Sequence, residues 1–91
     1  MFDDEECVSR VEGPCYGGTQ VRFKFANGRG ASVVSHKYSY GGDAGLWEIA
    51  VLNRHGHLDY STPITDDVIG RLPESEVRAT LAAIRALPEG E

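Results

Sequence analysis

Apolar and polar side chains alternate along residues 19–26. Three apolar residues fall on one face of this segment: Val21, Phe23 and Phe25. A period of two is typical of a strand with one buried face. The Asn27-Gly28 pair that follows favours a tight turn, because both residue types tolerate positive φ. We therefore predict a hairpin whose second strand covers residues 31–38.

The length of the hairpin loop decides which residues lie beside the phenylalanines. A two- or four-residue loop places Val34, His36 and Tyr38 on that face. A three-residue loop with a bulge places Val33 and Ser35 there instead. The sequence leaves both registers open.

A second alternating segment contains the only tryptophan, with Trp47, Ile49 and Val51 on one face. A four-residue loop over residues 53–56 predicts a second hairpin. This register pairs four positions: Val51 with Leu58, Ile49 with Tyr60, Leu52 with His57, and Ala50 with Asp59. We expect Trp47 to be an anchor of the core.

The C-terminal segment has helical periodicity, with Val77, Leu81 and Ile84 at spacings of four and three. The helix is predicted to begin near Pro73 and to end near Leu87. The predicted fold class is therefore α+β, a small antiparallel four-stranded sheet of two hairpins with the C-terminal helix packed on the face of Trp47. The opposite face, with Ala50, Leu52 and Val33, is partly apolar, and the leader, a second copy in a homodimer, or a partner would cover it.

The chain has 91 residues and a net charge of -5, which predicts one domain over residues 19–91, preceded by an acidic leader over residues 1–18. We expect residues 1–15 of the leader, including its two cysteines, to be dispensable for folding. No apolar run approaches the ~20 residues that cross a bilayer, so no membrane partner is expected. The acidic start MFDDEE is unlike a signal peptide, which predicts a cytoplasmic location.

Residues that could carry chemistry occur without a complete motif. Zinc ligands could be drawn from Cys7, Cys15, His55 and His57, but their spacing matches no familiar zinc site. Magnesium ligands could be drawn from Asp59, Asp66 and Asp67, although acidic residues at the start of a turn are explained by capping. Acyl transfer by His36 with Ser35 or Ser39 lacks an orienting acid. We predict a protein that is not an enzyme and has no catalytic residue, metal or cofactor.

A glycine-rich loop precedes Trp47, and its glycines exceed what a simple turn requires. We predict that this loop lies at a surface that binds a partner protein. The candidate residues are Tyr38, Tyr40, Gly41, Gly42, Asp43 and Glu48.

Basic residues gather in the first hairpin, and residues 13–40 contain no carboxylate. The alternative function is a small nucleic-acid-binding module that uses the basic hairpin over residues 19–40, with cations meeting phosphates. Its candidate residues are Arg22, Lys24, His36 and Lys37.

Three segments carry a resemblance to a known family: NGRGASVV (27–34), YSYGGDAGLWEIAVL (38–52) and TPITDDVIGRL (62–72). With these segments in this order, the chain resembles a family of small uncharacterised proteins encoded by actinobacterial bacteriophages and prophages. The resemblance covers roughly residues 19–88. It implies action inside an infected bacterial cell and identifies no catalytic residues. We therefore expect a non-enzymatic phage accessory protein that binds an unknown protein of host or phage.

Overall fold

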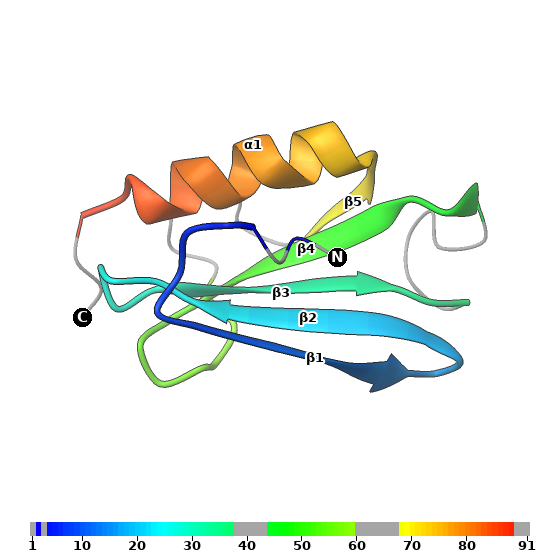
Figure 1. The fold of residues 1–91 in the computed structure, drawn as a ribbon, viewed down its shortest axis with the longest axis horizontal. Helices are drawn as coiled ribbons and strands as arrows, with labels where there is room; N and C mark the ends of the chain where they lie inside the picture. Colours follow the sequence, from blue (N-terminus) through cyan, green and yellow to red (C-terminus); the bar gives the residue numbers. More distant parts are fainter. Residues whose placement is uncertain (1, 3, 38–43, 60–67, 89–91) are drawn as a thin grey trace.

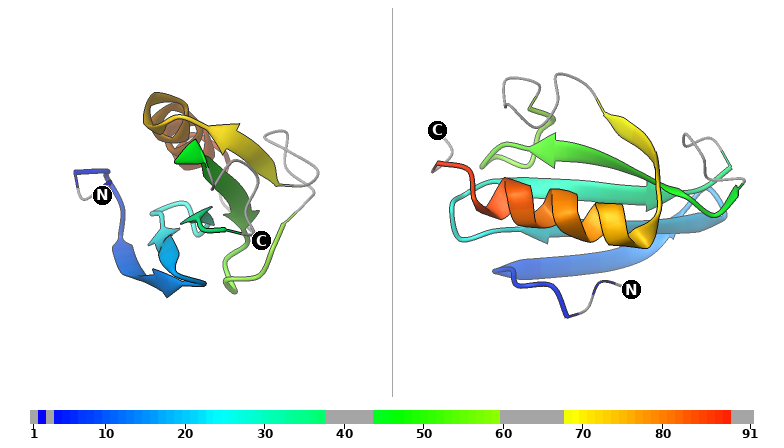
Figure 2. Two further views of the ribbon diagram at one scale, coloured as in Figure 1. Left: turned by 90° about the vertical axis from the view of Figure 1, so that its right-hand side faces the viewer. Right: turned by 90° about the horizontal axis from the view of Figure 1, so that it is seen from above.

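The computed structural model describes residues 2, 4–37, 44–59 and 68–88. Its antiparallel sheet has five strands in the order β1-β2-β3-β4-β5, so that neighbours in sequence are neighbours in space (Figure 1). The strands are β1 (Ser9–Cys15), β2 (Gly18–Lys24), β3 (Gly30–Ser35), β4 (Trp47–Leu52) and β5 (Ile69–Leu72). One helix, α1 (Glu74–Arg85), lies across one face of the sheet (Figure 2). The α+β class and the packed C-terminal helix are confirmed, whereas the prediction of four strands is wrong.

The core lies between α1 and the inner face of the sheet, which is the face that contacts the helix. The helix buries Val77, Leu81 and Ile84. These residues join one hydrophobic cluster with Trp47, Ile49 and Val51 of β4, and with the alternating residues of β2. The apolar residues that alternate along the strands and those spaced three and four apart on the helix thus pack in one core, as expected of an amphipathic helix on a half-buried sheet.

One unforeseen strand, β1, lies inside the acidic leader. It pairs with β2 along its whole length, from Ser9 opposite Lys24 to Cys15 opposite Gly18. Before β1, the chain turns back toward the helix side (Figure 1). There the Phe2 side chain is 1% exposed, and its ring meets the Trp47 ring edge to face at 5.2 Å. The leader therefore contributes both a strand and a core residue.

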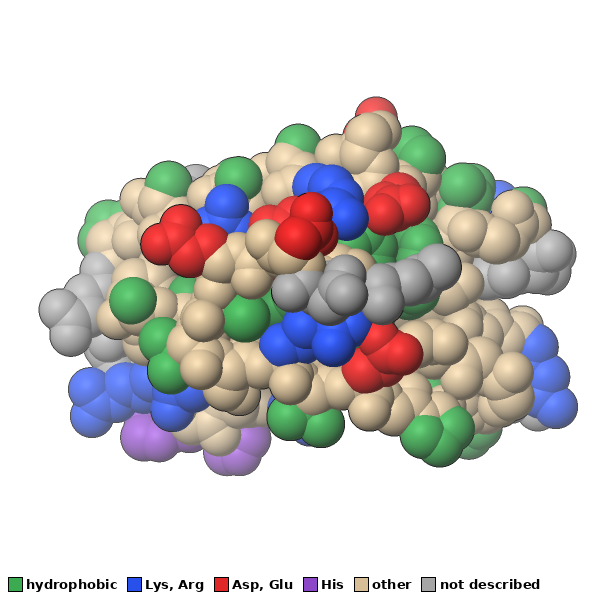
Figure 3. Space-filling view, in the orientation of Figure 1, with side chains coloured by type: hydrophobic (Ala, Val, Ile, Leu, Met, Phe, Trp, Pro, Cys, Tyr) green, Lys and Arg blue, Asp and Glu red, His purple; other side chains and the backbone are tan. Residues whose placement is uncertain are grey.

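Ion pairs join the leader to α1. The Glu5 carboxylate, whose side chain is largely buried, accepts hydrogen bonds from Arg78 at 3.1 Å and from Arg85 at 3.0 Å. Arg78 also binds Asp4 at 2.8 Å and Glu74 at 3.2 Å, and its guanidinium group lies over the Phe2 ring. The hydrogen bond from Arg78 lowers the pKa of the Asp4 carboxyl group below its usual range. Acidic and basic side chains alternate across the upper half of the molecule in Figure 3.

The β2–β3 hairpin closes through a three-residue loop. The Phe25 amide donates to the Arg29 carbonyl, and the Gly28 amide donates to the Phe25 carbonyl. Gly28 has a φ of 84°, which is the left-handed conformation that this bulged turn requires. As a result Val33, opposite Val21 and Ile49, is fully buried. The register with Val33 beside the phenylalanine face is the correct one, and Val33 does not belong to the outer face.

The second predicted hairpin is wrong by one residue. Leu58 pairs with Leu52 and not with Val51, and the loop has three residues instead of four. The physical reason is the same bulged turn, because Gly56 adopts a φ of 80°. Among the described residues, this segment forms a single isolated bridge with β4. The strand that pairs with β4 is β5, with Trp47 opposite Leu72 and Ile49 opposite Ile69. Tyr60, the expected partner of Ile49, lies outside the described residues.

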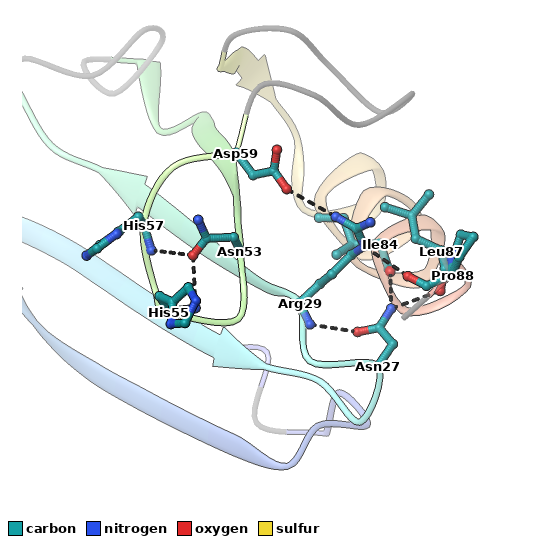
Figure 4. Close-up of polar contacts among 9 residues, drawn as sticks. All are labelled: Asn27, Arg29, Asn53, His55, His57, Asp59, Ile84, Leu87 and Pro88. Atoms are coloured by element: carbon teal, nitrogen blue, oxygen red, sulfur yellow. Dashed lines mark hydrogen bonds and ion pairs between the residues drawn. The ribbon is translucent and has the colours of Figure 1, made fainter. Parts of the chain in front are cut away.

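A side chain from the first hairpin caps the C-terminus of α1. The Asn27 amide nitrogen donates to the carbonyl oxygens of Ile84, Arg85 and Leu87, at 2.8, 3.2 and 3.1 Å (Figure 4). These carbonyls belong to the last turn, where a helix lacks its own donors. The Asn27 side-chain oxygen also accepts from the Arg29 amide at 3.0 Å. Asn27 therefore fixes the loop and the helix end together.

Replacing Asn27 by alanine is expected to lower the free energy of unfolding by about 1 to 2 kcal/mol, because helix-end carbonyls and the Arg29 amide lose their partner. Urea denaturation followed by circular dichroism measures this loss. Ala26→Ser, on the exposed neighbouring residue, is the control and should change little. An unchanged midpoint for Asn27→Ala would show that water replaces the cap at no cost.

Candidate functional site: a basic groove and an apolar strip on the sheet

The predicted partner-binding residues fall almost entirely in one segment. Tyr38, Tyr40, Gly41, Gly42 and Asp43 lie outside the described residues. Glu48 is described, and it lies on β4 opposite Val34, facing away from the helix. The structure therefore places only Glu48 of this set.

The four predicted nucleic-acid residues do not form one patch. Arg22 and Lys24 project from the outer face of β2, the face turned away from α1. His36 and Lys37 follow the end of β3, where β2 begins. Along β2, Lys24 lies five residues from Thr19, the partner of Ser35 at the end of β3, a span of about 17 Å, and Arg22 lies three residues from Thr19, a span of about 10 Å. His36 instead contacts the ring of Tyr16, with the ring centroids 5.1 Å apart.

Two rows of residues cross the outer face next to Arg22 and Lys24. Lys24 lies opposite Gly30, which lies opposite Leu52, and Arg22 lies opposite Ser32, which lies opposite Ala50. The long side chains of β2 thus stand beside the small residues of β3. At Gly30 a Cβ atom would lie 2.4 Å from the Phe23 carbonyl oxygen, so a larger residue does not fit there. The centre of this face is low, and its β2 side is basic.

These rows form the floor of a groove of about 370 Å³ between the first two strands and the loop over residues 53–56. We call it the basic groove, because its lining contains five cationic or titratable basic residues and no carboxylate: Arg22, Lys24, Arg29, Arg54 and His55. Val11 and Leu52 supply apolar surface beside them. Basic and histidine side chains lie together at the lower left of Figure 3.

The loop that carries Arg54 and His55 is held in a defined shape. The Asn53 side-chain oxygen accepts from the amides of His55 at 2.9 Å and His57 at 3.1 Å (Figure 4). The Asn53 amide also donates to the His57 carbonyl. From the opposite side, the Arg22 guanidinium donates to the Gly56 carbonyl at 3.0 Å. The groove therefore has two walls joined by a hydrogen bond.

The cations of the basic groove differ in how their charges are balanced. Arg29 forms an ion pair with Asp59 at 3.1 Å and donates to the Pro88 carbonyl, so it belongs to the helix end (Figure 4). Within the described ranges, no ion pair neutralises Arg22, Lys24 or Arg54. Three positive charges without an ion-pair partner among the described residues therefore gather in a protein whose net charge is -5.

Sequence reasoning found Arg22 and Lys24 but missed Arg54 and His55. The sequence signal for Arg54 and His55 is the turn from Asn53 to Gly56, which indicates an exposed loop with basic residues. Its position across the sheet from Lys24 follows only from the pairing of β3 with β4.

A second surface feature runs along β1. Large apolar residues are exposed along this edge: Val8, which precedes β1, is 65% exposed, Val11 within β1 is 64% exposed, and Tyr16, which follows β1, is 67% exposed. We call these three residues the β1 strip. Edge strands that expose apolar side chains are unusual in soluble domains, because they invite contact with other chains.

The other chemical alternatives do not assemble. Cys7 precedes β1, Cys15 is the last residue of β1, and both are free thiols. The Ser35 hydroxyl donates to the Leu46 carbonyl at 2.9 Å. Asp59 is paired with Arg29, while Asp66, Asp67 and Ser39 lie outside the described residues. Of the residues described, no three histidine, cysteine, aspartate or glutamate side chains form a group that could hold a metal ion.

Comparison of the chain with protein-family models, curated proteins and solved structures finds no match. The resemblance to phage-encoded proteins therefore stays a prediction. The helix α1 has 12 residues, and nothing helical in the described part of the chain is long and apolar enough to cross a membrane.

Proposed function

We propose that this chain is a non-enzymatic accessory protein of a bacteriophage, which binds a protein of the host or the phage through the β1 strip. The observation that carries the proposal is the exposure of Val11 in the edge strand β1 and of Val8 and Tyr16 directly before and after it. A partner that covers these side chains removes apolar surface from water, and each buried methylene group contributes about 0.8 kcal/mol.

The construction of β1 supports this proposal. Its inner positions Arg10 and Glu12 are polar, and its apolar residue Val11 faces away from the core. The strand is therefore not explained by core burial alone. Tyr16 occupies the turn after β1 with a φ of 47°, a conformation that is uncommon for a tyrosine and that presents its ring at the surface.

The test is affinity capture from actinobacterial cells with and without phage infection, using the full chain as bait. The double variant Val8→Ser with Tyr16→Asn should lose the captured partner while keeping its thermal midpoint, because both side chains are exposed. Asparagine tolerates the positive φ of position 16. Capture is read by mass spectrometry and the midpoint by circular dichroism.

The matched control is Ala82→Ser with Ala83→Ser on the exposed side of α1, which should keep the partner. A partner that both double variants retain equally would contradict the β1 strip as the binding surface. Enzymatic turnover that survives purification would contradict the non-enzymatic part of the proposal.

A further inference from the structure

We propose that the basic groove binds the phosphate groups of a single-stranded nucleic acid. This inference goes beyond the function proposed above: the cations of the groove belong to β2 and to the loop over residues 53–56, and of the β1 strip only Val11 lines the groove. Arg22, Lys24 and Arg54 line one groove from both walls, and none of them has an ion-pair partner among the residues that the structure describes.

The shape of the groove suits a phosphodiester backbone. Its volume of about 370 Å³ falls at the small end of ligand sites, enough for about one nucleotide unit at a time. Gly30 and the short side chains of Ser32 and Ala50 keep the outer face low beside it. A chain can therefore enter along the outer face instead of fitting into an enclosed cavity.

The donors in the groove are set before a ligand arrives. One of the five N–H donors of Arg22 holds the Gly56 carbonyl, which orients the guanidinium group across the groove. The hydrogen bonds of Asn53 fix the loop that carries Arg54. Donors that are already ordered lose less entropy on binding, and the planar guanidinium group matches phosphate oxygens.

The balance of charge favours a single strand over a duplex. The protein carries a net charge of -5, so its attraction for phosphate is local, and four of its nine lysine and arginine residues line the groove. A duplex presents one charge per about 1.7 Å over a wide, stiff surface. A flexible strand can bring two or three phosphates to the groove alone, and the His55 ring beside it can contact a base.

The experiment titrates the full chain into a labelled oligothymidylate of about twelve nucleotides and follows fluorescence anisotropy from about 50 to 200 mM salt. Three phosphate contacts predict that log Kd rises with log salt concentration with a slope of about 2. Arg54→Glu should weaken binding about tenfold or more, because it replaces an attractive charge by a repulsive one. Lys37→Glu makes the same change of charge at the other end of the sheet and should alter Kd by less than about twofold.

Lys24→Glu is a second, independent variant, and circular dichroism checks that each variant is folded. Equal weakening by Lys37→Glu and Arg54→Glu would overturn the groove as the site. Duplex DNA that binds as tightly as the single strand would overturn the choice of ligand, as would displacement of the oligonucleotide by an equal concentration of inorganic phosphate. The Val8→Ser, Tyr16→Asn variant should bind the oligonucleotide normally, which separates this proposal from the β1 strip.

Discussion

Replacing Trp47 by alanine is expected to lower the free energy of unfolding by about 3 to 5 kcal/mol. The indole is 5% exposed and belongs to the cluster beneath α1. It also meets the Phe2 ring edge to face, an arrangement that adds about 0.5 to 1.5 kcal/mol to simple burial. Domains of this size have a total stability of about 5 to 15 kcal/mol. The variant should therefore be marginally folded.

Urea denaturation followed by far-ultraviolet circular dichroism measures this loss. The method does not depend on tryptophan fluorescence, which the substitution removes. Val11→Ala, which truncates a residue that is 64% exposed, is the control and should change stability by less than about 0.5 kcal/mol. A denaturation midpoint of Trp47→Ala close to that of the wild type would contradict the role of the indole as a core anchor.

The elements that the sequence predicted best are those whose apolar pattern has one reading. Trp47, Ile49 and Val51 alternate on a strand, and the helix places its apolar residues at spacings of three and four; all of them lie in the core. Hydrophobic burial dominates folding free energy, so a clear pattern is decisive.

In the first hairpin, the apolar pattern does not determine the register of the two strands. Val33 and Val34 are adjacent and both apolar, so either could face the phenylalanines. The register is determined by Gly28, because its positive φ allows a three-residue loop. Gly56 closes the second hairpin in the same way, and this shifted Leu58 by one position against the prediction.

The strand β1 could not be predicted from apolar periodicity, because Arg10 and Glu12 occupy its inner positions. Its stability comes from backbone pairing with β2 and from the segment that precedes it. The strand β5 has only four residues and includes Arg71 at a φ of 58°, so it also lacks a strand signal. Both edges of the sheet thus depend on tertiary context rather than on local propensity.

Only part of the basic groove could be predicted from the sequence, because its residues come from two segments. Arg22 and Lys24 share a strand, so their common face follows from alternation alone. Arg54 joins them only because β4 pairs beyond β3 and because the Arg22 side chain reaches Gly56. A site built from two distant segments requires the sheet order, which the sequence did not determine.

Deleting residues 1–15 is expected to abolish cooperative unfolding, which reverses the expectation that the leader is dispensable. The deletion removes β1 and exposes the edge of β2. It also removes Phe2, whose side chain is 1% exposed in the core, and Glu5, which forms ion pairs with Arg78 and Arg85. Loss of an aromatic core residue alone costs about 3 to 5 kcal/mol.

The point variant Phe2→Ala isolates the largest part of this effect and should lower the midpoint of urea denaturation about as far as Trp47→Ala does. Val8→Ala is the matched control, since it truncates an exposed residue of the same leader. The double variant Phe2→Ala with Trp47→Ala should lose less than the sum of the two single losses, because the ring contact is counted in both. Strictly additive losses would show that the two rings stabilise the core independently. Cooperative unfolding of the variant that lacks residues 1–15 would contradict the role of the leader in the fold.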